Sequence, residues 1–201
     1  MQNPQVSGIY PSETGLVLVP PNPEIEKKYP WRYYHRFIDP ELAEPLYQEV
    51  DQYCVHRRGV SNGKPYQVGR KSCLFIENVS HESKKGSSAR TGYGRYKPLN
   101  FDQSPTLTKI KQLVEEWTRI KFPYSLVHVY RTGEDVIPWH RDKEALNPDT
   151  SIISISLGAT RKFRFREIGK TSGCLAEYHL QSGDMVWMLP GCQSKVMHTV
   201  P

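Results

Sequence analysis

The stretch SIISISLG at residues 151–158 decides the fold class of this 201-residue chain. Ile153, Ile155 and Leu157 lie on one side of the segment, and serines separate them on the other. Strict alternation of apolar and polar residues is typical of a β-strand with one buried face. The stretch therefore predicts a strand whose sheet covers a hydrophobic core.

Short segments of the same kind surround it. Strands are predicted at residues 125–131, 162–166, 175–180 and 184–189, each bounded by glycine or polar turns. In the second of these, Phe163 and Phe165 alternate with basic residues. Several short strands that follow N-terminal helices indicate an α+β fold, a double-sheet β-barrel or jelly roll with helical buttresses.

Two helices are predicted before these strands. Asp39 suits the N-cap and Pro40 the first turn, and apolar residues then recur at helical spacing (Leu42, Leu46, Val50 and Tyr53). A second helix over residues 105–121 carries one apolar stripe. We expect that stripe to pack against a sheet.

The chain divides into an arm and one domain. Residues 1–30 are rich in proline, asparagine and glycine and predict an extended arm. Residues 31–201 suffice for a single core. Within them, residues 59–100 are poor in apolar side chains and predict a long irregular loop, a type of segment that is often functional. Its basic residues and tyrosines suit phosphates and stacked bases, and the alternative is a solvated loop with a few packed tyrosines.

Composition narrows the class of partner and the compartment. The chain has 27 basic and 21 acidic residues, a net charge of +6 that favours polyanions such as nucleic acid. No secretory signal or membrane-spanning segment is visible, and the four cysteines are scattered as reduced thiols rather than as a disulfide or zinc framework. We expect an intracellular monomer, in the cytoplasm or nucleus, that does not contact membranes.

His140, Asp142 and His198 are the candidate metal ligands. Pro138 argues against a helix here, and in an extended segment His140 and Asp142 face the same side. Two histidines and one carboxylate form the facial triad of non-haem Fe(II) oxygenases. A His-x-Asp tripeptide is common by chance, however, and an isolated histidine is more often an ordinary polar residue, as we expect for His179.

The order of several blocks adds weight to this pattern. The blocks are LVHVY at 126–130, a glycine turn at 133, IPWHRDKE at 137–144, SIISISLG at 151–158, RKFRFR at 161–166, GDMVWML at 183–189 and HTVP at 198–201. Together they resemble the AlkB family of Fe(II)- and 2-oxoglutarate-dependent dioxygenases, which oxidise alkyl groups on nucleic acid bases. The resemblance covers residue 31 to the end and implies a double-stranded β-helix (jelly roll) with N-terminal helices buttressing one sheet.

The resemblance implies roles for individual residues. His140, Asp142 and His198 would hold Fe(II), and Tyr130 would donate a hydrogen bond to a carboxylate of 2-oxoglutarate. His128 stands where relatives usually carry asparagine, and it would make the second contact to the co-substrate.

The implied substrate-binding residues are more widely spread. Glu144 would lie near a flipped base, or pair with neighbouring basic residues instead. Within the lid region at residues 59–100, Arg70 and Lys71 would form the basic start of the nucleotide-recognition lid, Phe75 would stack on the base, and the lid tyrosine would be Tyr93 or Tyr96. Arg161 would form a salt bridge or line the base pocket.

The implied activity is oxidative dealkylation of N-alkylated bases in methylated DNA or RNA, with 2-oxoglutarate converted to succinate and the alkyl group lost as an aldehyde. Family members usually carry a co-substrate-binding arginine about ten residues beyond the second histidine, and this sequence stops before that position. We therefore expect a fragment of a longer protein that lacks the final strand. The alternatives are a protein hydroxylase on the same scaffold and a non-catalytic nucleic-acid-binding module. Neither the choice between DNA and RNA nor the alkylated base can be read from the sequence.

Overall fold

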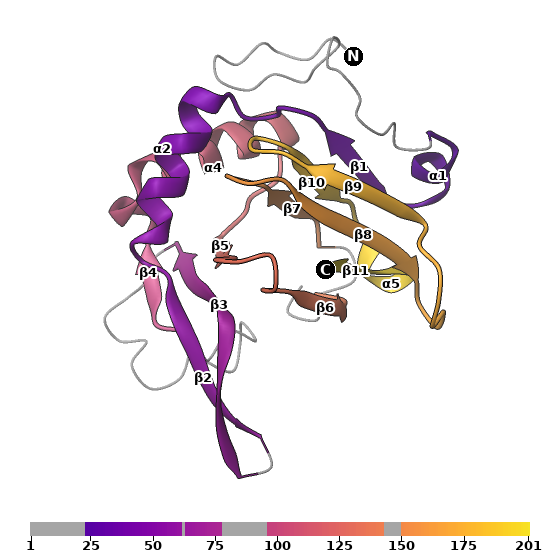
Figure 1. The fold of residues 1–201 in the computed structure, drawn as a ribbon. Helices are drawn as coiled ribbons and strands as arrows, with labels where there is room; N and C mark the ends of the chain where they lie inside the picture. Colours follow the sequence, from indigo (N-terminus) through magenta and orange to yellow (C-terminus); the bar gives the residue numbers. More distant parts are fainter. Residues whose placement is uncertain (1–22, 62, 78–95, 143–149) are drawn as a thin grey trace. The chain divides into compact units, whose positions relative to one another are not determined.

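The computed structural model describes residues 23–61, 63–77, 96–142 and 150–201 (Figure 1). The chain forms two compact units, residues 1–44 with 137–201, and residues 45–136. Each unit is described by itself.

The described part of the first unit holds two antiparallel sheets. One has the order β1–β10–β7, built from Trp31–Tyr34, Met185–Met188 and Ile152–Ile155. The other has the order β6–β11–β8–β9, built from Ile137–His140, Val196–Val200, Arg161–Glu167 and Ala176–Leu180. Two short helices, α1 (Pro23–Lys28) and α5 (Cys192–Lys195), complete this unit.

The core of the first unit lies between these two sheets. Trp31 of β1 stacks on Phe165 of β8, with ring centroids 4.1 Å apart, and its Nε1 donates a 2.8 Å hydrogen bond to Tyr178 Oη of β9. Tyr29, which precedes β1, and Cys192 of α5 belong to the same buried cluster as the inward side chains of both sheets (Phe163, Leu180, Val186, Met188 and Val196). Alternation places these residues on one face of each strand, as the sequence predicts.

A tight turn before β10 fixes the register of this sheet. Gly183 has φ +88°, and a Cβ added there would lie 2.2 Å from the carbonyl oxygen of Ile38. The adjacent Asp184 is fully buried, and its carboxylate accepts hydrogen bonds from Tyr33 Oη and the backbone N–H of Arg36, both at 2.9 Å. The turn is thereby joined to the segment that follows β1.

The second unit is built around the long strand β3 (Lys64–Ile76). It pairs antiparallel with β2 (Val55–Ser61) and β5 (Tyr124–Val129), and parallel with β4 (Pro98–Asn100). The short 3-10 helix η2 (Phe101–Gln103) leads into α4 (Pro105–Thr118). Helix α2 (Pro40–Asp51) crosses the boundary between the units.

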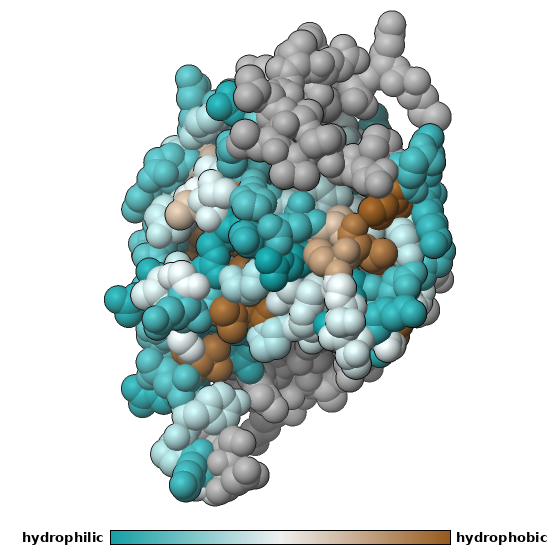
Figure 2. All heavy atoms as spheres, turned by 45° about the vertical axis from the view of Figure 1, so that its right-hand side comes forward, coloured by the Kyte–Doolittle hydropathy of each residue, from teal (hydrophilic) through white to brown (hydrophobic). Residues whose placement is uncertain are grey.

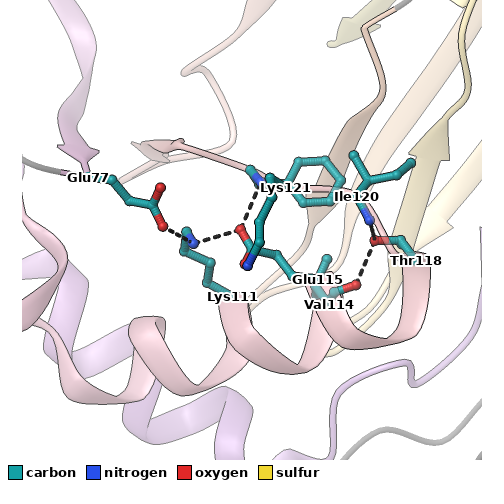
Figure 3. Close-up of polar contacts among 8 residues, drawn as sticks. Glu77, Lys111, Val114, Glu115, Thr118, Ile120 and Lys121 are labelled. Atoms are coloured by element: carbon teal, nitrogen blue, oxygen red, sulfur yellow. Dashed lines mark hydrogen bonds and ion pairs between the residues drawn. The ribbon is translucent and has the colours of Figure 1, made fainter.

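A cluster of charges fixes the C-terminal end of α4 (Figure 3). Glu115 is 8% exposed, and its carboxylate accepts hydrogen bonds from Lys111 Nζ at 2.6 Å, Lys121 Nζ at 2.7 Å and the backbone N–H of Phe122 at 2.8 Å. Burial alone would raise the pKa of Glu115, but these hydrogen bonds outweigh it and lower the pKa from 4.5 to about 2. Arg119, with φ +61°, ends the helix.

Several elements differ from the sequence predictions. Helix α1 lies within the predicted extended arm, and the end of β2 and all of β3 lie in the region predicted to be irregular. Polar residues suffice there because β2 and β3 pair as a hairpin whose side chains are largely exposed as far as Gly69. The predicted helix from residue 105 ends at Thr118 rather than at residue 121, and the five predicted strands are present as β5 and β7–β10 with slightly different ends.

The strand-rich α+β class predicted from the sequence is therefore present, whereas the predicted domain boundaries and the missing final strand stay predictions. Among the described residues, no helix is long and apolar enough to cross a membrane. The face shown in Figure 2 is mainly hydrophilic, with apolar side chains in small separate patches.

Candidate metal centre

His140, Asp142 and His198 come together in the first unit. His140 ends β6 and lies directly opposite His198 of β11, with ring centroids 4.2 Å apart. Asp142 follows two residues after β6, and its carboxylate oxygens lie 3.5 Å from His140 Nε2 and 3.5 Å from His198 Nε2. One ligand atom from each residue falls within 4.8 Å of the others.

Neighbouring groups orient these side chains. His140 Nδ1 lies 2.8 Å from the carbonyl oxygen of Pro138, which fixes the proton on Nδ1 and leaves the Nε2 lone pair directed at Asp142. The backbone N–H of Asp142 donates a 3.0 Å hydrogen bond to Gln193 Oε1. The Thr199 hydroxyl donates to the carbonyl of Ile137 at 2.6 Å and holds β6 against β11.

His198 is held in its neutral form. Burial lowers its pKa, His140 lowers it further, and Asp142 raises it, with a net result of about 4. A neutral imidazole has a lone pair, which is what metal coordination requires. Its Nδ1 is buried and has no hydrogen-bond partner within the described ranges.

The arrangement fits a divalent metal ion. Ligand atoms bonded at about 2.1 Å on adjacent octahedral corners are roughly 3 Å apart. The 3.5 Å separations here need only a small contraction to reach that value. Two imidazoles from the paired strands β6 and β11, with one carboxylate from the segment after β6, can hold one face of the ion and leave the opposite face open.

The two residues expected to bind the co-substrate lie in the second unit. His128 belongs to β5, and its Nδ1 lies 2.7 Å from the Ser72 hydroxyl of β3. Tyr130 directly follows the strand and stands two positions after His128, so that both side chains lean to the same face of an extended chain. Both are half-buried.

Arg70 and Lys71, which were expected to start the lid, both make polar contacts. Arg70 Nη1 donates to the carbonyl of Val136 at 3.1 Å, and Lys71 Nζ lies 3.3 Å from Asp51 Oδ1. These two cations are half-buried on β3.

The role expected for Phe75 needs a correction. Phe75 is 0% exposed and packs edge-on against Tyr53, with ring centroids 5.7 Å apart, and against Phe101 at 6.0 Å. It is a core residue of the second unit, because it points into the layer between β3 and the helices' side chains, and it offers no face for stacking on a base. Sequence alone does not separate the two faces of this strand.

Arg161 and the remaining candidates complete the set. Arg161 begins β8, and its Nη2 donates to the carbonyl of Pro201 at 2.9 Å. Tyr96 is half-buried, whereas Glu144 and Tyr93 lie outside the described residues.

A comparison with protein families decides the identity of the chain. The family model of the 2OG-Fe(II) oxygenase superfamily matches residues 30–201. The chain belongs to this superfamily. The superfamily's name carries both cofactors expected from the sequence, Fe(II) and 2-oxoglutarate.

Relatives of this 2OG-Fe(II) oxygenase are AlkB homologues, which confirms the resemblance found in the sequence. It is 39% identical over 137 residues to human (Homo sapiens) alpha-ketoglutarate-dependent dioxygenase alkB homolog 3, covering 67% of this chain and 44% of that protein. The bovine (Bos taurus) homologue matches at 39% over 65% of this chain and 43% of its own length. Mouse (Mus musculus) DNA oxidative demethylase ALKBH2 is 35% identical over 48% of this chain and 44% of its own length. The matched part is thus less than half of each relative.

A solved structure shows the same fold. The structure of OsALKBH1 superposes with a TM-score of 0.54 over 86% of this chain and 85% of that chain, at 14% identity. This likeness concerns the fold alone, and it is consistent with the predicted jelly roll.

Two further residues of this oxygenase escaped the sequence analysis. Gln193 lies in α5 and contacts the backbone of Asp142, and Arg57 of β2 donates to Tyr96 Oη at 2.9 Å with its guanidinium 4.9 Å from the ring centroid. An isolated glutamine gives no signal in one sequence. Arg57 could have been noticed as one more cation near the lid tyrosines.

Proposed function

We propose that this chain, with Fe(II) and 2-oxoglutarate, removes alkyl groups oxidatively from N-alkylated bases in DNA or RNA. The observation that carries the proposal is the convergence of His140, Asp142 and His198 across the β6–β11 ladder. The names of the relatives, among them a DNA oxidative demethylase, support oxidative dealkylation as the class of reaction. The matched segment spans less than half of each of those proteins.

His140, Asp142 and His198 would hold the metal from one side. When bound, iron and 2-oxoglutarate supply the oxidising chemistry that removes an alkyl group from nitrogen, with molecular oxygen as the oxidant. The chain's own contribution is to present two imidazoles and one carboxylate in a fixed arrangement. The Pro138 carbonyl and Gln193 maintain that arrangement before the metal arrives.

Residues other than the metal ligands would contribute the binding groups. Tyr130 and His128 would donate hydrogen bonds to a carboxylate of 2-oxoglutarate, and the negative charge of this acceptor would strengthen them. Tyr96 would contact the nucleic acid in an orientation set by Arg57.

The remaining substrate contacts rest on the resemblance. Arg70 and Lys71 would approach phosphates, while Glu144, Arg161 and Tyr93 would stand near the base. A nucleic acid substrate agrees with the net charge of +6. The monomeric state and the location in the cytoplasm or nucleus are proposals that agree with the same substrate.

An oligonucleotide-dependent succinate assay tests the proposal. With Fe(II), 2-oxoglutarate and oxygen, we expect succinate to form several-fold faster with an N-methylated oligonucleotide than with its unmethylated counterpart. His140→Ala should abolish the stimulated rate. His179→Ala is the matched control, because His179 is an exposed histidine of the same unit on β9 whose ring contacts Glu177.

Two outcomes would replace the proposal. Succinate formation that responds to peptides and to no methylated oligonucleotide would indicate a protein hydroxylase. Salt-dependent oligonucleotide binding with no metal-dependent turnover in any substrate would indicate a nucleic-acid-binding module.

A further inference from the structure

Two buried cysteines of the second unit lie against each other. Cys54 immediately precedes β2 and Cys73 lies in β3, and each is 5% exposed. Their Sγ atoms are 2.9 Å apart. The chain has 18 residues between them, so the sequence gives no sign of this pairing.

The strand register explains the contact. Val55 lies opposite Ser72 in the antiparallel β2–β3 ladder, and the next position places Cys54 opposite Cys73. Opposed residues of such a ladder have Cα atoms about 4.5–5.5 Å apart, which lies within the span of about 4.4–6.8 Å seen in disulfides. The sulfur atoms need to approach by less than about 1 Å to reach the bonded distance of roughly 2.05 Å.

We propose that Cys54 and Cys73 form a redox-active dithiol whose oxidation by a hydroperoxide staples the base of the β2–β3 hairpin. This inference is independent of the proposed function. It assigns a covalent modification site to a pair that the sequence analysis treats as two separate reduced thiols. Cys174 and Cys192, in contrast, belong to the other unit.

The chemistry balances with hydrogen peroxide as the oxidant. One thiol sulfur attacks a peroxide oxygen and breaks the O–O bond, which yields a sulfenic acid (Cys–SOH) and one water. The second thiol sulfur then attacks the sulfenic sulfur, forms the S–S bond and releases a second water as its proton joins the departing hydroxyl. The two thiols lose two electrons and the peroxide gains them.

The surroundings set the rate and the consequence. A hydrogen bond with Cys54 raises the pKa of Cys73, and burial raises it further, so that little thiolate forms at neutral pH and oxidation should take minutes to hours. Ser72, the chain neighbour of Cys73, contacts His128, with 2.7 Å between the Ser72 hydroxyl and His128 Nδ1. A staple here would therefore rigidify β3 beside a residue expected to bind the co-substrate.

Peptide mapping of the full 201-residue chain tests the proposal. The chain is incubated with hydrogen peroxide and a chelator, remaining thiols are alkylated, and the protein is digested without reductant. Trypsin cleaves after Arg57, Arg58, Arg70 and Lys71, which separates the two cysteines into different peptides. We expect a Cys54–Cys73 linked pair, two mass units lighter than the free peptides together, that dithiothreitol releases.

Variants and an unfolded sample provide the controls. Cys174→Ser removes the exposed thiol and should leave the linked pair unchanged, while Cys73→Ser should abolish it. In urea the same treatment should give mixed pairings. Oxidation of the native chain should raise Tm by roughly 5–10 °C, because the staple closes a loop of about twenty residues.

The inference is overturned if peroxide oxidises Cys174 in the native chain while Cys54 and Cys73 are both recovered as free thiols. It is overturned equally if the linked peptides are as mixed in the native chain as in urea. Neither result depends on a variant folding correctly.

Discussion

His140 and His198 face each other as a cross-strand pair of β6 and β11, with their ring centroids 4.2 Å apart. Such a pair brings two imidazoles together without any loop having to fold over the site. The hydrogen bond from the Thr199 hydroxyl to the carbonyl of Ile137 fixes the same ladder. The sheet thus positions two of the three residues of the metal centre, His140 and His198.

Gln193 should tune the metal site without being a ligand. Its Oε1 accepts the backbone N–H of Asp142, so Gln193→Leu leaves that N–H without its partner and loosens the carboxylate. We expect Fe(II) affinity to fall by about 10- to 100-fold, the usual effect of losing a group that orients a ligand. Anaerobic equilibrium dialysis measures it, and Ser194→Ala on the same helix is the control.

An unchanged affinity in Gln193→Leu, with an unchanged Tm, would show that Asp142 is held by other groups. Loss of metal binding together with loss of the folded state would say nothing about orientation, so thermal melts accompany each dialysis.

Gly183 should be intolerant of any side chain. Its φ of +88° strains other residues, and the Cβ of alanine would lie 2.2 Å from the carbonyl oxygen of Ile38. We expect Gly183→Ala to lose more than about 3 kcal/mol of unfolding free energy. Gly169 has a similar φ of +82° with nothing within 4 Å, so Gly169→Ala should lose only about 1 kcal/mol. Urea melts compare the two, and equal losses would contradict the close approach.

Glu115 should make stability depend on pH below neutrality. Its pKa is about 2 in the fold and 4.5 without its partners, so the folded state favours the ionised form. Its contribution is therefore complete above about pH 5 and is lost as the pH falls through about 2. At pH 7 we expect Glu115→Gln to cost roughly 2–3 kcal/mol.

The same variant should converge with the unmodified chain as the pH falls. Denaturant melts at pH 7, 4 and 3 measure the gap between them, and Glu116→Gln, at an exposed neighbouring position, is the control. A gap that stays constant over this range would mean that the ion pairs shown in Figure 3 do not form in solution.

Arg57 should affect substrate binding more than turnover. It lies over Tyr96 and donates to its hydroxyl, so Arg57→Ala frees the ring that we expect to contact nucleic acid. We expect KM for a methylated oligonucleotide to rise about three- to tenfold, since a lost cation–π and hydrogen-bond contact is worth about 1 kcal/mol. The value of kcat should change little. Lys109→Ala, which removes one exposed charge from α4, separates this effect from that of net charge.

The sequence predicts this site better than it predicts the second unit. The alternating strands and the His-x-Asp segment are local patterns. They indicate the strands of the first unit and two of the three proposed metal ligands, His140 and Asp142. The long strand β3 is not visible in this way, because its polar half is stabilised by pairing with β2 rather than by burial of an apolar face. In the run Cys73–Ile76 both faces of the strand carry apolar side chains, so the sequence cannot tell that Phe75 points into the core.

Contacts between distant residues are the other part that the sequence does not reveal. Gln193 reaches the backbone of Asp142, and Cys54 meets Cys73, only after the strands have paired. The contact between Cys54 and Cys73 depends on the register of β2 and β3, and a shift of one position would turn one side chain to the opposite face.

An anaerobic titration of Fe(II) with and without 2-oxoglutarate tests the central claim most directly. The account predicts one Fe(II) per chain, bound through His140, Asp142 and His198, with loss of binding in both His140→Ala and His198→Ala and none in His179→Ala. Fe(II) binding that is equally strong in His140→Ala, His198→Ala and the unmodified chain would contradict the assignment of the metal centre.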